Sequence, residues 1–301
     1  MINQLLTIYW DFNPVLVRLG DSFDIRYYGL MWALAIGLAA YMFDRFVKRE
    51  GLPEKVSESI FYFGTLATII GSRVGHCIFY EPDKYLAEPL RILTDIRDGG
   101  MASHGAAIGL LIGLCLFSRR NKLPYLWSLD RIMIAVAIGG AFVRLGNLFN
   151  SEIVGAPTDL PWGFIFARMY PVGTPVAEMV ARHPAQIYEA LCYVITFVIL
   201  MYLYYKRDMA RRRPGLMFGV GLIGIFLTRF LIEFVKENQE AFEQSMTLNM
   251  GQLLSVPFII AAFVLIWYAM KNPAIEPKAA QSAPKAVAAN PKTKKAKKKK
   301  W

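Results

Sequence analysis

Several signatures of familiar functional classes are missing from this chain of 301 residues. Three cysteines occur, all in apolar stretches and without a CxxC pair, so we expect neither disulfides nor a cysteine metal site: Cys77, Cys115 and Cys192. The sequence has no HExxH motif and no DxD-type carboxylate cluster, so no metal ion is predicted. It also lacks a P-loop and a GxGxxG turn, which argues against a nucleotide cofactor. A basic n-region and a cleavage site are lacking too, so no removable signal peptide is expected.

The net charge of +11 is concentrated at one end of the chain. Residues 271–301 contain ten lysines and one glutamate among Ala and Pro, and we predict a disordered tail there. Such a tail would be a solvated, cytoplasmic extension that also favours anionic lipid headgroups. Nucleic-acid binding is the weaker interpretation because no aromatic residues alternate with the lysines, so no nucleic-acid partner is expected.

Long apolar runs dominate the rest of the sequence, which is 55% hydrophobic overall. Seven of these runs have roughly the 20 residues that an α-helix needs to cross a bilayer. Backbone polar groups must be paired inside lipid, and the runs are too long for barrel strands, so they predict helices. The predicted spans are residues 27–46, 57–79, 99–117, 127–147, 185–205, 216–235 and 250–270.

The placement of Lys and Arg predicts the orientation of these spans. Of the 34 basic residues, 22 follow the first, third, fifth and seventh spans, 8 lie on the opposite side and four lie within spans. We therefore expect an all-α, polytopic membrane protein with an outside N-terminus, a cytoplasmic C-terminus and one membrane domain over residues 1–270. Residues 80–98 could form an amphipathic segment at the outer interface, and residues 148–184 are long enough for a small extracytoplasmic cap.

Ionisable side chains near the outer ends of these spans are the main functional signal, because charge inside a membrane is costly. Each has a structural explanation when taken alone. Arg73 could extend to the interface, and Arg229 with Glu233 could be an intrahelical ion pair. His104, in a glycine-rich segment, could be a packing histidine. A polar helix end could explain Asn147, Asn150 and Glu152.

Taken together, these residues indicate a site for an anionic lipid. If the topology is correct, the charges lie in one layer at headgroup depth, with Arg144 deep among apolar residues. Guanidinium groups match the oxygens of a phosphate, and a histidine with carboxylates can transfer protons. A transporter or flippase for anionic lipids is the alternative, although inverted repeats are missing and the charges do not form a path across the membrane.

Several segments resemble those of phosphatidylglycerol–prolipoprotein diacylglyceryl transferases. The longest is RLGNLFNSEIVG at 144–155. The others are YYGLM at 27–31, GGMASHGAAIG at 99–109, RHPAQIYE at 182–189, TRFLIEFVKE at 228–237 and MGQLLS at 250–255. The chain departs from the family pattern in reading SHGAAIG rather than HGGLIG, and in having Ile225 for tyrosine and Lys236 for arginine.

The resemblance implies a seven-span enzyme of the bacterial inner (plasma) membrane without metal or nucleotide cofactor. Its implied substrates are phosphatidylglycerol and the lipobox segment of a prolipoprotein. The diacylglyceryl group would pass to the lipobox cysteine thiol and release glycerol phosphate. We expect the protein to act as a monomer among membrane lipids.

The resemblance also implies roles for individual residues. Arg144 matches the arginine that binds the lipid headgroup, and His104 matches a histidine proposed as essential. Other important positions match Tyr28, Asn147, Glu152, Gly155, Arg229 and Glu233. We hypothesise that His104 is the base, with Glu152 or Tyr28 as rivals, and that Arg144 and Arg229 hold the phosphate. Asn147 would orient the headgroup and Glu233 would orient Arg229, while Arg73 is a further candidate for substrate binding.

Overall fold

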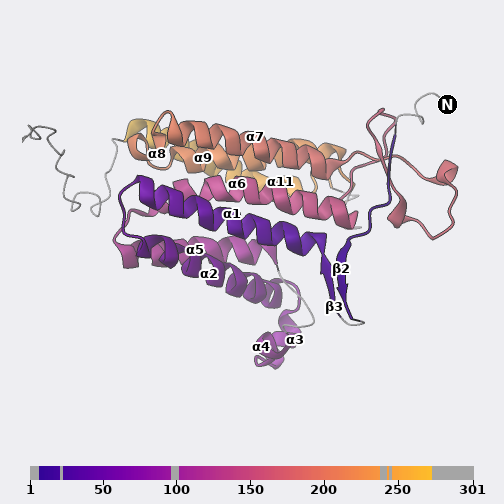
Figure 1. Ribbon diagram of the computed structural model, residues 1–301, viewed down its shortest axis with the longest axis horizontal. Helices are drawn as coiled ribbons and strands as arrows, with labels where there is room; N and C mark the ends of the chain where they lie inside the picture. Colours follow the sequence, from indigo (N-terminus) through magenta and orange to yellow (C-terminus); the bar gives the residue numbers. More distant parts are fainter. Residues whose placement is uncertain (1–6, 21–22, 96–101, 238–242, 244–245, 273–301) are drawn as a thin grey trace, which may run out of the picture.

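Long helices lying side by side make up most of the protein (Figure 1). The computed structural model describes residues 7–20, 23–95, 102–237, 243 and 246–272. Within these residues, five helical segments are long and apolar enough to cross a membrane: α1 (Tyr27–Arg49), α6 (Tyr125–Asn150), α7 (Ala185–Tyr205), Leu216–Val235 and α11 (Met250–Lys271). The chain is therefore a mostly helical, polytopic membrane protein.

Two further predicted spans also form long helices, α2 (Lys55–Phe79) and α5 (Ser103–Asn121). They are not among the five, because glycines and polar residues make both less apolar. The two helices pack backbone against backbone: a Cβ atom added to Gly71 would lie 2.7 Å from the Cα of Gly109. Glycines in both helices permit this approach. Residues 99–101, where the third span was predicted to begin, lie outside the described residues.

The predicted sixth span is one continuous segment made of four elements of three helical types. It consists of α9 (Leu216–Leu222), the π-helical η5 (Ile223–Leu227), α10 (Thr228–Ile232) and the 3₁₀ turn η6 (Glu233–Val235). A π-helical turn inserts an extra residue and often occurs beside functional sites. Here it lies directly before the turn that carries Arg229.

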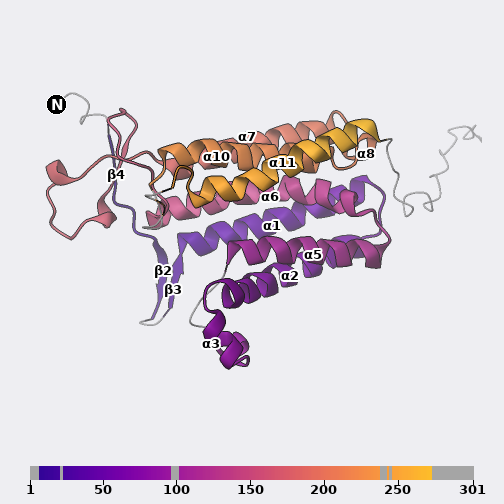
Figure 2. The same cartoon turned by 180° about the vertical axis from the view of Figure 1, so that it is seen from behind.

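One end of the bundle carries almost all of the irregular structure, and we call it the site end. There α1, α5 and α7 begin and α2 and α6 end (Figure 2). Two short helices, α3 (Pro82–Ala87) and α4 (Arg91–Thr94), project sideways from it, and we call them the α3–α4 arm. The C-terminal end of α11 lies at the other end of the bundle, the far end.

Two small sheets at the site end were not predicted. β1 (Ile8–Trp10) pairs in parallel with β4 (Phe164–Phe166), and β2 (Val15–Leu19) forms a hairpin with β3 (Phe23–Arg26). The all-α prediction thus holds for the bundle but misses these strands. β1 and β4 are distant in the sequence and have three residues each, too few for an alternating pattern to be recognised.

The loop between α6 and α7 contains β4 and the 3₁₀ turns η3 (Ala167–Met169) and η4 (Val176–Glu178). Phe164 and Phe166 pack with Leu148 and Val154 in a small core of their own. Backbone bridges join Pro157 to Arg182 and join the loop to the residues that follow η6. The loop is therefore ordered against the ends of α6, α7 and η6.

A buried ionic network holds the far end together. Glu50, just after α1, accepts hydrogen bonds from Arg131 Nε (3.0 Å) and Nη2 (2.9 Å), from Trp127 Nε1 (2.6 Å) and from the Tyr204 hydroxyl (2.6 Å). Arg131 is fully buried. Nearby, Asp130 accepts the backbone N–H groups of Gly215 (2.7 Å) and Phe218 (2.9 Å) at the start of α9. These contacts tie α1, α6, α7 and α9 together.

Candidate functional site

Four charged side chains, from α6, from α7 and from the end of the sixth span, meet inside the site end. Arg144 Nε in α6 lies 2.6 Å from Glu189 Oε2 in α7. Lys236 Nζ, just after η6, lies 3.4 Å from Glu189 Oε1 and 2.9 Å from Glu233 Oε2. Their side chains are at most 11% exposed. We call Arg144, Glu189, Glu233 and Lys236 the buried quartet.

The start of α11 supports the carboxylate of Glu233. A Cβ atom added to Gly251 would lie 2.6 Å from Glu233 Oε1, so the carboxylate rests on the first turn of this helix. A complete capping box between Asn249 and Gln252 fixes that turn. The N-terminus of a helix carries partial positive charge, which favours a negative side chain at this place.

Arg229 differs from the cations of the quartet. It lies in α10, which packs against α7, the helix that carries Glu189, and against α11, whose first turn supports Glu233. We expected an ion pair with Glu233, yet Glu233 pairs with Lys236. Among the described residues, no carboxylate lies within ion-pair distance of the half-buried Arg229. A cation in this position is suited to an anion from outside the protein.

A chain of polar groups extends from Arg144 toward the loop after α6. Arg144 Nη1 donates to Asn147 Oδ1 (3.5 Å), and Asn147 Nδ2 donates to Glu152 Oε2 (3.3 Å). Gln186 Nε2 donates to the backbone oxygen of Glu152 (2.6 Å), which fixes the loop against α7. The structure therefore brings three predicted site residues into one network, with the Glu152 side chain exposed at its end.

Two glycines allow other segments to pack closely beside this network. A Cβ atom on Gly146 would lie 2.8 Å from the ring of Tyr28, so Tyr28 packs directly on the last turns of α6. Gly155 lies between the backbones of His183 and Val235, and its N–H donates to the His183 oxygen (2.9 Å). Any larger residue at position 155 would separate the loop from α7 and η6.

Arg73 lies in a different environment. Its Nε donates to the Ile92 oxygen (3.0 Å), and its Nη2 donates to the Tyr85 hydroxyl (3.2 Å) and to the Arg91 oxygen (3.3 Å). These bonds attach the α3–α4 arm to the end of α2. The candidate role of Arg73 in substrate binding stays a prediction.

His104 was the predicted base, and its side chain lies outside the described part of the structure. Its backbone belongs to the first turn of α5. The start of α5 and the end of α6, the helix that carries Arg144 in its last turns, lie at the same end of the bundle (Figure 2). The hypothesis that both serve one site is therefore compatible with the arrangement of the helices.

The chain was compared with known proteins. Residues 14–268 match the family described as prolipoprotein diacylglyceryl transferase. The chain belongs to this family. A relative from Porphyromonas gingivalis, named phosphatidylglycerol–prolipoprotein diacylglyceryl transferase, is 48% identical over 273 residues, 88% of this chain and 96% of the relative. Relatives of the same name from Chloroherpeton thalassium and Bacteroides fragilis are 40% and 39% identical, over 89% and 92% of this chain and 97% and 100% of their own lengths.

The part that matches the transferase family contains the whole buried quartet and Arg229, whereas the lysine-rich tail lies beyond it. Sequence reasoning missed the roles of Glu189 and Lys236. Lys236 lies three residues after Glu233, a spacing typical of an ion pair in a helix, and this signal could have been used. In the sequence, Glu189 stands out only as the last residue of the family-like segment at 182–189. No sequence signal indicated its contact with Arg144.

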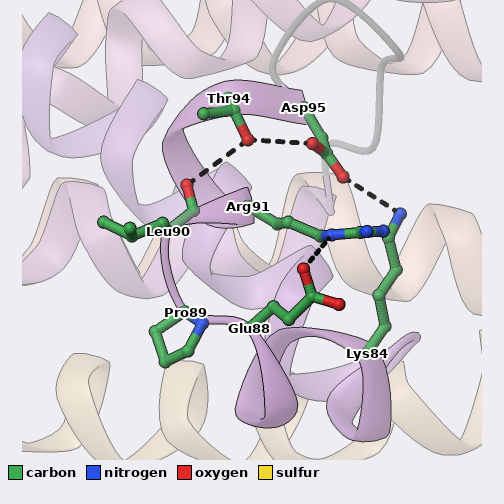
Figure 3. A pocket seen from close by; sticks show the side chains of 7 residues that line it. All are labelled: Lys84, Glu88, Pro89, Leu90, Arg91, Thr94 and Asp95. Carbon is green, nitrogen blue, oxygen red and sulfur yellow. Dashed lines mark hydrogen bonds and ion pairs between the residues drawn. The ribbon is translucent and has the colours of Figure 1, made fainter.

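The α3–α4 arm has an open hollow of about 730 Å³ (Figure 3). None of the residues that line this hollow belongs to the quartet. Its charged groups are already paired: Lys84 with Asp95 (3.3 Å) and Arg91 with Glu88 (2.7 Å). Among the described residues, no group of three or more His, Cys, Asp or Glu side chains could hold a metal ion. The quartet with Arg229 is therefore the candidate site.

Proposed function

We propose that this chain transfers the diacylglyceryl group of phosphatidylglycerol to the lipobox cysteine thiol of prolipoproteins. The names of its relatives describe a diacylglyceryl transferase for phosphatidylglycerol and prolipoprotein. The products are a thioether-linked lipoprotein precursor and glycerol phosphate. The observation that carries this proposal in the structure is Arg229, a half-buried cation beside a charge-balanced quartet. Family membership supplies the reaction, and Arg229 with Arg144 supplies a place for the lipid phosphate.

The proposal includes a topology. All seven predicted spans cross the bacterial inner membrane, the N-terminus and the site end face outward, and the tail faces the cytoplasm. The loop of residues 148–184 is then an extracytoplasmic cap over the site, and the arm lies at the outer interface. Exposed apolar residues around the helices support a lipid environment, for example Leu66, Ile112, Ile195 and Phe263. We further propose that the protein acts as a monomer.

In the proposed mechanism, Arg144 and Arg229 hold the phosphodiester and Asn147 orients the headgroup. The cysteine sulfur attacks the glycerol carbon that carries the phosphate, so a C–S bond forms as the C–O bond breaks. The departing phosphate ester takes the electron pair, and the arginines stabilise its charge. Glu233 acts by holding Lys236 rather than by pairing with Arg229.

The attacking thiol must lose its proton, because a thiol of pKa about 8.5 is only slightly ionised at neutral pH. We propose His104 as the base, with Glu152 and Tyr28 as the other candidates. Glu152 is exposed and hydrogen-bonded to Asn147, and Tyr28 packs against α6 nearby. Replacing each in turn and following the rate against pH identifies the group that takes the proton.

The test uses purified protein, a lipobox peptide and phosphatidylglycerol micelles, with mass spectrometry of the peptide. The wild-type protein should add one diacylglyceryl group per cysteine, and a Cys→Ser peptide should gain none. The Arg144→Ala variant should lose transfer, and Arg144→Lys should lose most of it, because Lys lacks the planar fork of donors. A lipid transporter would move phosphatidylglycerol between leaflets and leave the peptide thiol free. That result would reject the proposal.

A further inference from the structure

Glu189 is a fully buried carboxylate that touches two cations. Its Oε2 lies 2.6 Å from Arg144 Nε and its Oε1 lies 3.4 Å from Lys236 Nζ. A buried carboxylate is costly unless it is paired, and these two contacts provide that pairing. They also fix the position of the Arg144 guanidinium.

Arg144 Nε lies 2.6 Å from Glu189 Oε2, yet this oxygen accepts no hydrogen bond, so the contact is an ion pair rather than a directed N–H bond. Arg144 Nη1 donates to Asn147 Oδ1 over 3.5 Å, which is at the long limit for a hydrogen bond. The ion pair therefore fixes the position of the guanidinium without using its N–H donors, which suit the oxygens of a phosphate.

The charges of the quartet balance. Two cations, Arg144 and Lys236, face two carboxylates, Glu189 and Glu233. Arg229 adds one positive charge without a carboxylate partner among the described residues. A phosphodiester carries one negative charge, so its arrival would neutralise the group. Removing Glu189 would disturb both this balance and the position of Arg144.

We propose that Glu189 is a positioning residue, whose ion pair with Arg144 holds the guanidinium where its N–H groups meet the lipid phosphate. Lys236 compensates the charge of Glu189 and Glu233 and does not contact the substrate. This inference rests on the proposed function and adds a second residue on which phosphatidylglycerol binding depends.

Three variants separate positioning from charge balance. Glu189→Gln leaves one buried cation in excess and should lower both the melting temperature and the affinity for phosphatidylglycerol. Glu189→Gln/Lys236→Met restores the balance, so its melting temperature should return to within a few degrees of the wild type. Its KM for phosphatidylglycerol should stay raised by about tenfold or more, because Arg144 remains unheld. The KM for the lipobox peptide should change by less than about twofold.

Glu189→Asp provides a test that does not depend on the double variant folding. It keeps the charge but shortens the side chain by one methylene, so the KM for phosphatidylglycerol should rise about fivefold or more at an unchanged melting temperature. Glu178→Gln, at an exposed position in η4, is the matched control and should behave as wild type.

The outcomes distinguish this inference from the proposed function. An inactive, correctly folded wild-type protein would reject the proposed function. An active wild type together with wild-type KM values in Glu189→Asp, or in the double variant, would reject only the positioning role of Glu189. A double variant that recovers both stability and KM would show that Glu189 contributes charge balance alone.

Discussion

The network around Glu50 predicts a large loss of stability from a single isosteric change, Glu50→Gln. The carboxylate of Glu50 accepts bonds from Arg131, Trp127 and Tyr204, and the Arg131 side chain is 0% exposed. A glutamine amide at this position would leave the buried guanidinium of Arg131 without the negative charge of Glu50. It would also place an NH₂ group, which donates, against the N–H and O–H donors that now bind the carboxylate.

The expected magnitude follows from this burial. Removing one partner of a buried pair costs about 3–5 kcal/mol, because the remaining charge stays buried and unpaired. A change of 1 kcal/mol shifts the melting temperature of a domain of 150–250 residues by about 2–4 °C. Glu50→Gln should therefore melt about 6–20 °C below the wild type. The double variant Glu50→Gln/Arg131→Met, which removes both charges, should recover most of this loss.

The assay is thermal unfolding in detergent, monitored by intrinsic fluorescence. Transferase activity is measured on each variant well below its melting temperature. The KM for phosphatidylglycerol should remain at the wild-type value, because the network lies at the far end of the bundle (Figure 1). A melting temperature within about 2 °C of the wild type would show that the buried pair is not stabilising and would refute this reasoning.

Three further predictions concern other parts of the structure. Gly71→Ala should separate α2 from α5 and lower the melting temperature, because the new Cβ would meet the backbone of α5. Gly251→Ala should displace the carboxylate of Glu233 and raise the KM for phosphatidylglycerol about threefold or more. The α3–α4 arm should loosen in acid, because the bond from Lys84 holds the pKa of Glu81 below its ordinary value of 4.5. The stability that this bond adds to the arm is present above pH 4.5 and is lost as the pH falls through the lowered pKa. Protection factors from amide hydrogen exchange in the arm will measure this loss.

The two glycine substitutions share a control. Gly37→Ala in α1, where an added Cβ meets nothing within 4 Å, should leave both melting temperature and KM unchanged. If Gly71→Ala melts like Gly37→Ala, the close packing of α2 and α5 does not contribute to stability. An unchanged KM in Gly251→Ala would contradict the support that α11 gives to Glu233. Protection factors in the arm that stay constant from neutral pH to pH 3 would contradict the role of the Glu81 carboxylate.

The sequence predicted the helices because membrane spans are encoded locally. Runs of about 20 apolar residues and the polar residues between them define each helix without reference to its neighbours. The sequence also predicted that Arg144, Asn147 and Glu152 would lie together, since they lie within nine residues around the end of one helix. The family resemblance extended this prediction to the reaction.

Contacts between distant segments could not be predicted in the same way. The pair of Arg144 with Glu189, and the bonds of Glu50 with Tyr204, depend on how helices pack rather than on local pattern. The prediction that Glu233 orients Arg229 used the i, i+4 spacing of a regular helix. In the structure η6 is a 3₁₀ turn and Lys236 follows it, so Glu233 has a different partner.

The central claim is that a lipid phosphate binds to Arg229 beside the buried quartet. The most direct test measures kcat/KM for phosphatidylglycerol in Arg229→Ala, because among the described residues this cation has no carboxylate whose loss of pairing would complicate the result. We predict a fall of about 100-fold or more, with a melting temperature close to that of the wild type. A kcat/KM within about threefold of the wild type would contradict the claim.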